Sequence, residues 1–141
     1  MPSPDPLTIA RLFAAALDRC DFAGASRYLS PDCRYQIGGG ELIGPEAIIG
    51  SYRDSAEWGS RTLEQVIYES EVEEGQDGLS VLFTDRILHH GQKHESYSRQ
   101  HLTMDENGQI VRIIHEELPG EREALERFFK HCGVKPLRLQ S

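Results

Sequence analysis

The sequence has no run of about 18 consecutive apolar residues, the length that a membrane-spanning helix requires. Its opening segment, MPSPDPLTIARLF, has no positively charged stretch followed by an apolar core, so no signal peptide is expected. Positive charge is also scarce: 15 Lys and Arg against 23 Asp and Glu give a formal net charge of -8. Because nucleic acids and anionic membranes are bound through positive patches, we expect a cytoplasmic protein that binds neither.

Cysteine is rare as well, and Cys20, Cys33 and Cys132 have no CxxC spacing. An odd number of cysteines without that spacing indicates reduced thiols. The six histidines include no HExxH motif and no Cys–His pair at zinc-finger spacing, so neither a metal ion nor another cofactor is expected. His90 and His94, which flank a predicted turn, remain a minor metal-binding alternative.

The length and composition are those of one ordinary globular domain. A chain of 141 residues with 38% hydrophobic and 27% charged residues can bury roughly two thirds of its unfolded surface. We therefore expect a single domain over residues 1–141, with a C-terminal helical extension over residues 119–133.

Apolar residues at helical spacing, bounded by Asp, Gly and Pro, predict four helices. The helices are expected to begin at Asp5–Pro6, Asp21, Gly44–Pro45 and Pro119–Gly120. The first is expected to end near Cys20 and the third at Gly59. In the fourth, Lys130 and His131 in the last turn complement the helix dipole.

Alternating residues predict a short strand over residues 33–37 and a longer one over residues 62–73. Three long strands follow between Leu79 and Leu118, separated by turns at residues 91–93 and 105–108. Polar residues at alternate positions of these hairpins suggest a curved sheet in which one face lines a wet or functional region.

This order of elements resembles the nuclear-transport-factor-2-like superfamily, which includes SnoaL-like polyketide cyclases and ketosteroid-isomerase-like proteins. The resemblance covers about residues 7–118, and three segments carry it: LTIARLFAAALDRCDFAGASRYLSPD, GPEAIIGSY and MDENGQIVRI. It implies an α+β cone in which a strongly bent, mostly antiparallel sheet wraps around three N-terminal helices and leaves a pocket at its open end. It also implies a homodimer that binds a small hydrophobic or aromatic organic ligand.

The candidate site depends on how the strands of the first long hairpin pair. If the loop at residues 91–93 places His90 opposite His94, Asp85 faces Arg99. A tighter turn shifts the pairing and moves Arg99 to the face opposite Asp85. With the first register, the candidate catalytic residues are Asp85, Arg99 and His101. The candidate ligand-binding residues are Tyr35, Tyr52, Trp58, Phe83, His89 and Tyr97.

Two functions fit these residues, because the fold alone does not define one. A cofactor-independent isomerase, dehydratase or cyclase would use His101 or Asp85 for acid–base chemistry, with Arg99 stabilising developing negative charge. A non-catalytic ligand-binding or dimerisation module would carry the same residues on a solvated face. Ketosteroid-isomerase-like members have a general-base Asp after the first strand, where this sequence has glycines at 38–40, so that chemistry is not expected in its known form.

Overall fold

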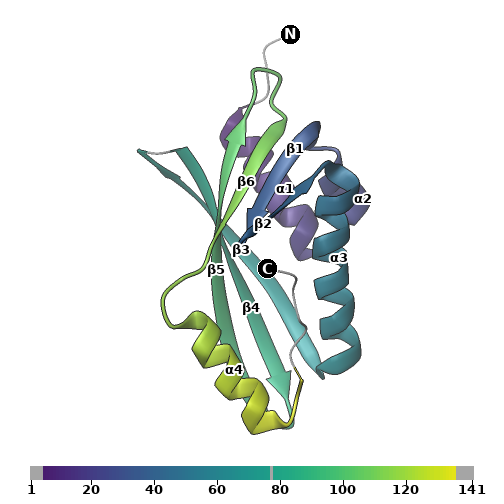
Figure 1. Cartoon of the computed structure of the whole chain (residues 1–141), viewed down its shortest axis with the longest axis vertical. Helices are drawn as coiled ribbons and strands as arrows, with labels where there is room; N and C mark the ends of the chain where they lie inside the picture. The colour runs from purple at the N-terminus through teal and green to yellow at the C-terminus, as the bar shows by residue number, and fades with distance from the viewer. Residues whose placement is uncertain (1–4, 77, 136–141) are drawn as a thin grey trace.

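Figure 1 shows the computed structural model of the chain, which describes residues 5–76 and 78–135. Its elements are, in chain order, α1 (Pro6–Asp18), α2 (Phe22–Ser26), β1 (Leu29–Ile37), β2 (Gly40–Ile43), α3 (Pro45–Thr62), β3 (Gln65–Gly75), β4 (Gly78–His89), β5 (Gln92–Met104), β6 (Ile110–Glu116) and α4 (Glu121–Cys132). The strands form one sheet in the order β2-β1-β6-β5-β4-β3, antiparallel except for the parallel pair β1 and β6. The predicted α+β class with a bent, mostly antiparallel sheet is confirmed.

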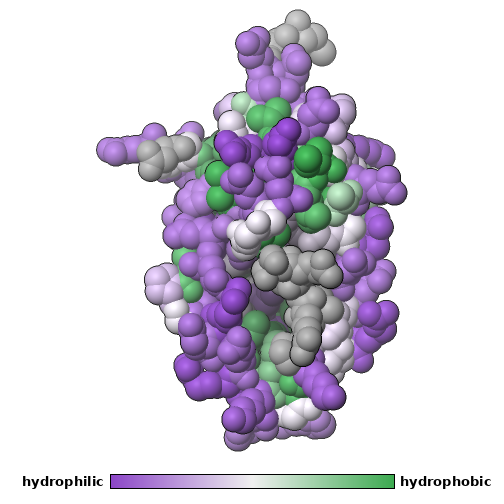
Figure 2. Space-filling model, viewed as in Figure 1, coloured by the Kyte–Doolittle hydropathy of each residue, from purple (hydrophilic) through white to green (hydrophobic). Residues whose placement is uncertain are grey.

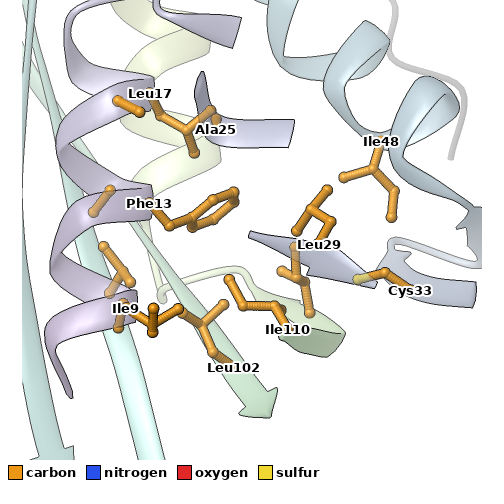
Figure 3. Packing of buried hydrophobic residues seen from close by; sticks show 14 of the residues in the cluster. Ile9, Phe13, Leu17, Ala25, Leu29, Cys33, Ile48, Leu102 and Ile110 are labelled. Atoms are coloured by element: carbon orange, nitrogen blue, oxygen red, sulfur yellow. The ribbon is translucent and has the colours of Figure 1, made fainter. Parts of the chain in front are cut away.

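The helices cover one face of the sheet, here named the inner face, and the other is named the outer face (Figure 1). Ile9, Phe13 and Leu17 recur at intervals of four residues, so they share the stripe of α1 that faces the sheet. Figure 3 shows this stripe directed toward Leu29 of β1 and Ile110 of β6. The resulting main cluster joins α1, α2 and α3 to the inner face of the upper sheet.

A second apolar cluster lies at the other end of the inner face, and α4 closes it. Ile87 of β4 packs there with Phe128 and Phe129 of α4, and the ring of Trp58 meets that of Phe129 at a centroid distance of 5.5 Å. Figure 2 shows apolar surface beside α4 in the lower part of the molecule, bordered by hydrophilic residues. The helix predicted after Pro119 is confirmed, and it packs on the inner face.

Several boundaries differ from the prediction because tertiary packing overrides local signals. β1 begins at Leu29, four residues before the start of the strand predicted over residues 33–37. The strand β2 was not predicted: the turn through Gly38, whose φ is 58°, folds it back onto β1. α3 continues past Gly59 to Thr62, because Gly59 is buried against β3 and does not end the helix.

Some expectations concern residues beyond the described ranges. Residues 1–4, position 77 and residues 136–141 lie outside them. Across the described ranges, no helix combines the length and apolar character needed to cross a membrane. The same ranges contain no group of three His, Cys, Asp or Glu side chains placed to hold a metal ion.

Candidate active site

The hairpin between β4 and β5 turns through only two residues, His90 and Gly91. Their φ angles are 49° and 74°, and His89 pairs with Gln92. Positive φ at both central residues is the type I′ pattern, which is favoured because its twist matches that of the flanking strands. The prediction that His90 faces His94 is therefore wrong, and the chain adopts a tighter turn.

The tighter turn separates the three predicted catalytic residues. Asp85 lies on the inner face, two positions from the buried Ile87 of the same strand. Arg99 pairs with Leu82 and lies on the outer face together with His101. The predicted pairing of Asp85 with Arg99 is accordingly wrong, because the register differs by an odd number of residues.

Arg99, His101 and Tyr97 have acidic partners on the outer face. The contacts are Arg99–Glu73 at 3.5 Å, His101–Glu116 at 2.7 Å and the hydrogen bond from Tyr97 to Glu95. Side chains this exposed contribute little to stability through such pairs, since water screens their charges.

The other predicted ligand-binding residues are divided along the inner face. Tyr35 and Tyr52 meet at a ring-centroid distance of 5.5 Å, beside the main cluster, and Phe83 packs against the same cluster. Trp58 belongs to the second cluster. His89 lies at the end of β4, where its Nδ1 accepts a hydrogen bond of 3.3 Å from the backbone N–H of Glu64.

Polar side chains occupy the inner face between the two apolar clusters, and we name them the polar belt. Cross-strand pairing places Tyr68 and Ser96 on either side of Asp85, and Ser70 and Ser98 on either side of Phe83. The belt comprises Asp18, Tyr35, Tyr52, Tyr68, Ser70, Asp85, Ser96, Ser98, Gln100 and His115.

Gln100 organises one end of the belt. It is 4% exposed, and its Oε1 accepts a hydrogen bond of 2.5 Å from the Tyr52 hydroxyl. Its Nε2 donates to the Tyr35 hydroxyl at 2.8 Å and lies 3.5 Å from Nδ1 of His115. Burial raises the pKa of both tyrosines and lowers the pKa of His115, so all three side chains are neutral near pH 7.

A pair of carboxyl groups marks the other end. Burial, and secondarily the charge of Asp18, raises the pKa of Asp85 from 3.8 to about 6. Burial also raises the pKa of Asp18, although the Ser70 hydroxyl donates a 2.5 Å hydrogen bond to it. Burial and the charge of Asp85 raise the pKa of Tyr68 to about 12. The belt thus offers a carboxyl group that titrates near neutrality beside a protonated phenol.

Two cavities flank the edge strand β3 and reach this end of the belt. One, of about 360 Å³, lies between α1 and β3 and includes Asp18 and Ser70. The other, of about 290 Å³, lies between α3 and β3 and includes Gly59 and Tyr68. The first lies at the lower end of the volume range of small-ligand sites, roughly 300–1,000 Å³, and the second lies just below that range.

Sequence reasoning missed Gln100, His115, Asp18, Tyr68 and Ser70. The predicted register placed the even-numbered residues of β5, including Gln100, on the wrong face. For Asp18 the contact spans 52 positions, from α1 to Ser70 of β3, and no local pattern indicates it.

No model of a protein family matches the sequence, and a search of curated proteins finds no significant match. Solved structures do match. A proposed polyketide cyclase from Pseudomonas putida KT2440 has a TM-score of 0.63 at 16% identity, over 85% of this chain and 96% of that one. TerC, co-crystallised with polyporic acid, has a TM-score of 0.65 at 16% identity, over 89% of this chain and 98% of that one.

A nuclear-transport-factor-2-like protein of unknown function from Burkholderia pseudomallei K96243 has a TM-score of 0.64 at 18% identity, over 86% of this chain and 95% of that one. At such low identity the likeness concerns the fold. The chain has the nuclear-transport-factor-2-like fold, and the resemblance stated from the sequence is confirmed at that level. The fold does not define a reaction.

Proposed function

We propose that the protein binds a small, uncharged, hydrophobic or aromatic molecule against the polar belt and catalyses proton transfer at carbon without a cofactor. Asp85 is the general base in this proposal. The observation that carries it is the raised pKa of this largely buried carboxyl group, which burial and Asp18 bring to about 6. A base with a pKa near the working pH combines ionisation with useful basicity.

The surroundings of Asp85 suit this role. Among the described residues, none forms an ion pair or a hydrogen bond with its carboxylate, so the group is free to meet a ligand. The apolar clusters on both sides would exclude water from the ligand and strengthen electrostatic effects. Arg99 and His101, on the outer face, serve surface contacts in this proposal.

The proposed step starts at a carbon beside a carbonyl group. Asp85 takes a proton from this carbon, and the electron pair of the C–H bond moves toward the carbonyl oxygen. Neutral donors of the belt, such as the Tyr68 hydroxyl, stabilise the charge that develops on the ligand. Returning the proton to another conjugated carbon completes an isomerisation.

Exchange of the C1 protons of 2-tetralone in D₂O, followed by proton NMR, tests the proposal. This hydrophobic ketone has an acidic C–H bond, and exchange reports proton abstraction directly. We expect the wild type to exceed the buffer rate and Asp85→Asn to lose at least ~100-fold of that excess. Asp54→Asn, which changes an exposed aspartate of α3, is the matched control.

Equal exchange in the wild type and in Asp85→Asn would remove Asp85 from the reaction. Binding of 2-naphthol, measured by thermal shift, without any exchange would instead support a non-catalytic ligand-binding module of the same fold.

A further inference from the structure

We propose that the cavity between α1 and β3 is a second binding site, for a small linear molecule with an ammonium group at one end and a carboxylate group at the other. Asp18 receives the ammonium group, and Arg11 receives the carboxylate group. The site differs from the proposed catalytic one in its ligand class, and its test involves no proton exchange. The result is therefore independent of the role of Asp85.

One stripe of α1 forms a wall of this cavity. Arg11, Ala14, Ala15 and Asp18 line it, and their helical spacing places them on the same side of α1. Asp18 follows Arg11 by seven residues, so the two Cα atoms are about 10 Å apart along the helix axis. The small alanine side chains between them leave room for a ligand that extends from one charged group to the other.

The edge strand β3 forms the opposite wall. Ser70 and Val72 line the cavity and lie on the inner face, because alternate residues of a strand share a face. Val72 packs against the main cluster, and with the alanines of α1 it gives the middle of the cavity an apolar surface. A cavity of about 360 Å³ with charged ends and an apolar middle suits a short chain of methylene groups that ends in two charges.

Asp18 lacks a positive partner. Its carboxyl group forms no ion pair with any of the described residues, and the hydrogen bond from Ser70 engages only Oδ2. Burial raises the pKa of Asp18, because the group has lost water without gaining a cation, and the charge of Glu69 adds to this effect. An ammonium group that donates to Oδ1 and to the Ser70 hydroxyl oxygen supplies the missing charge.

Arg11 lacks a negative partner. Within residues 5–76 and 78–135, no carboxylate forms an ion pair with its guanidinium group, whereas Arg86 and Arg99 pair with glutamates. A guanidinium group can hold a carboxylate through two parallel N–H donors. Because the protein has a net charge of -8, a ligand with a carboxylate alone would be repelled, and an amine alone would leave Arg11 unpaired. A molecule with both groups satisfies both ends of the cavity.

Four related compounds test the site by isothermal titration calorimetry of the full-length protein at pH 7. 6-Aminohexanoate carries the two charges at its ends, and its isomer norleucine carries both on one carbon. Hexanoate and hexylamine carry one charge each. We expect 6-aminohexanoate to bind at least ~10-fold more tightly than each of the other three. Equal affinity for norleucine would overturn the assignment of the charges to opposite ends, and equal affinity for hexylamine would overturn the role of Arg11.

Variants assign the two ends of the ligand. Arg11→Gln and Asp18→Asn should each weaken the binding of 6-aminohexanoate at least ~10-fold. Ala15→Leu, at an exposed position of α1, keeps both charges but fills the cavity, so it should abolish binding. Arg61→Gln and Asp54→Asn, at exposed positions of α3, are the matched controls and should retain the wild-type affinity. Wild-type affinity in both Arg11→Gln and Asp18→Asn would overturn the proposal.

A second measurement uses only the wild type and does not depend on the folding of a variant. In the ¹⁵N-labelled protein, 6-aminohexanoate should shift the backbone amide resonances of Ala15 and Val72 and leave that of Gly91, in the turn between β4 and β5, unchanged. Unchanged resonances of Ala15 and Val72 would overturn the site. Exchange of 2-tetralone by the same sample would still support Asp85 as the base, so the two proposals can fail separately.

Discussion

At the scale of single residues, the ionised carboxyl group of Asp85 serves the proposed function but lowers the stability of the folded state. Its pKa is raised, so the folded state binds the proton more tightly than the unfolded state. The stability linked to this proton is fully present below the unfolded pKa of 3.8 and is lost as the pH rises to about 6. Above that pH, the ionised group costs roughly 2 kcal/mol, allowing for its partial exposure.

Asp85→Asn should therefore stabilise the protein at pH 8 and have little effect near pH 4, because an amide avoids the cost of a buried negative charge. Urea denaturation at both pH values measures the difference, with Asp54→Asn as the exposed control. The same variant loses the proposed base, so a gain in stability would accompany a loss of proton exchange. A stability difference that is equal at both pH values would contradict this account.

At the scale of elements, α3 contains two glycines with opposite surroundings. A Cβ on Gly50 would meet nothing within 4 Å, whereas one on Gly59 would lie 3.3 Å from the Tyr68 hydroxyl and 3.5 Å from a Val66 methyl group. Replacing a helical glycine with alanine gains about 1 kcal/mol where space allows. Gly59 thus lets the helix approach the belt closely.

Gly50→Ala should raise the free energy of unfolding by about 0.5–1 kcal/mol. Gly59→Ala should gain less or lose stability, and it should slow the exchange of 2-tetralone because the Tyr68 hydroxyl must shift. Urea denaturation and the exchange assay on both variants check this. Equal stabilisation by the two changes, with unchanged exchange, would show that the contact is unimportant.

Elements whose ends carry local chemical signals were predictable from the sequence. Asp21 caps α2 by accepting a hydrogen bond from the Gly24 N–H at 3.0 Å, and Pro45 begins α3, both as expected. The assignment of Asp85 and Phe83 to one face followed from strand alternation. The register of β5 could not be predicted from residues 89–93, because this stretch of sequence fits both a two-residue and a three-residue turn.

A single turn therefore determines which residues of β5 lie on the inner face with the candidate site. A type I′ turn through His90 and Gly91 moves Gln100 and His94 to the inner face and Arg99 to the outer face. The contacts of Asp18 and Tyr68 depend on packing between elements distant in sequence. Such contacts leave no periodic pattern in the sequence. The cone-shaped fold and some residues of the inner face were therefore predictable, but most residues of the polar belt were not.

At the scale of the whole molecule, the distribution of charge favours an uncharged ligand. The formal net charge is -8, and the belt adds Asp18 and Asp85 in a poorly solvated region. The arginines of β4 and β5, Arg86 and Arg99, are paired with glutamates on the outer face. An anionic ligand would therefore meet negative charge without a compensating cation from these strands, and Arg11 of α1 is the cation that lines the cavity beside Asp18.

Comparing 2-naphthol with 2-naphthoate isolates this effect, because the two compounds share one ring system and differ in charge. By fluorescence titration at pH 7, we expect 2-naphthoate to bind at least ~10-fold more weakly, a difference of about 1.4 kcal/mol. The difference in affinity between the two compounds should be smaller at pH 5, because Asp85 takes up a proton as the pH falls through about 6. In the Asp85→Asn variant, this difference in affinity should be small at both pH values. Equal affinities for the two compounds in the wild type at pH 7 would mean that the ligand does not lie near the carboxyl pair, since a negative charge placed there cannot avoid their repulsion.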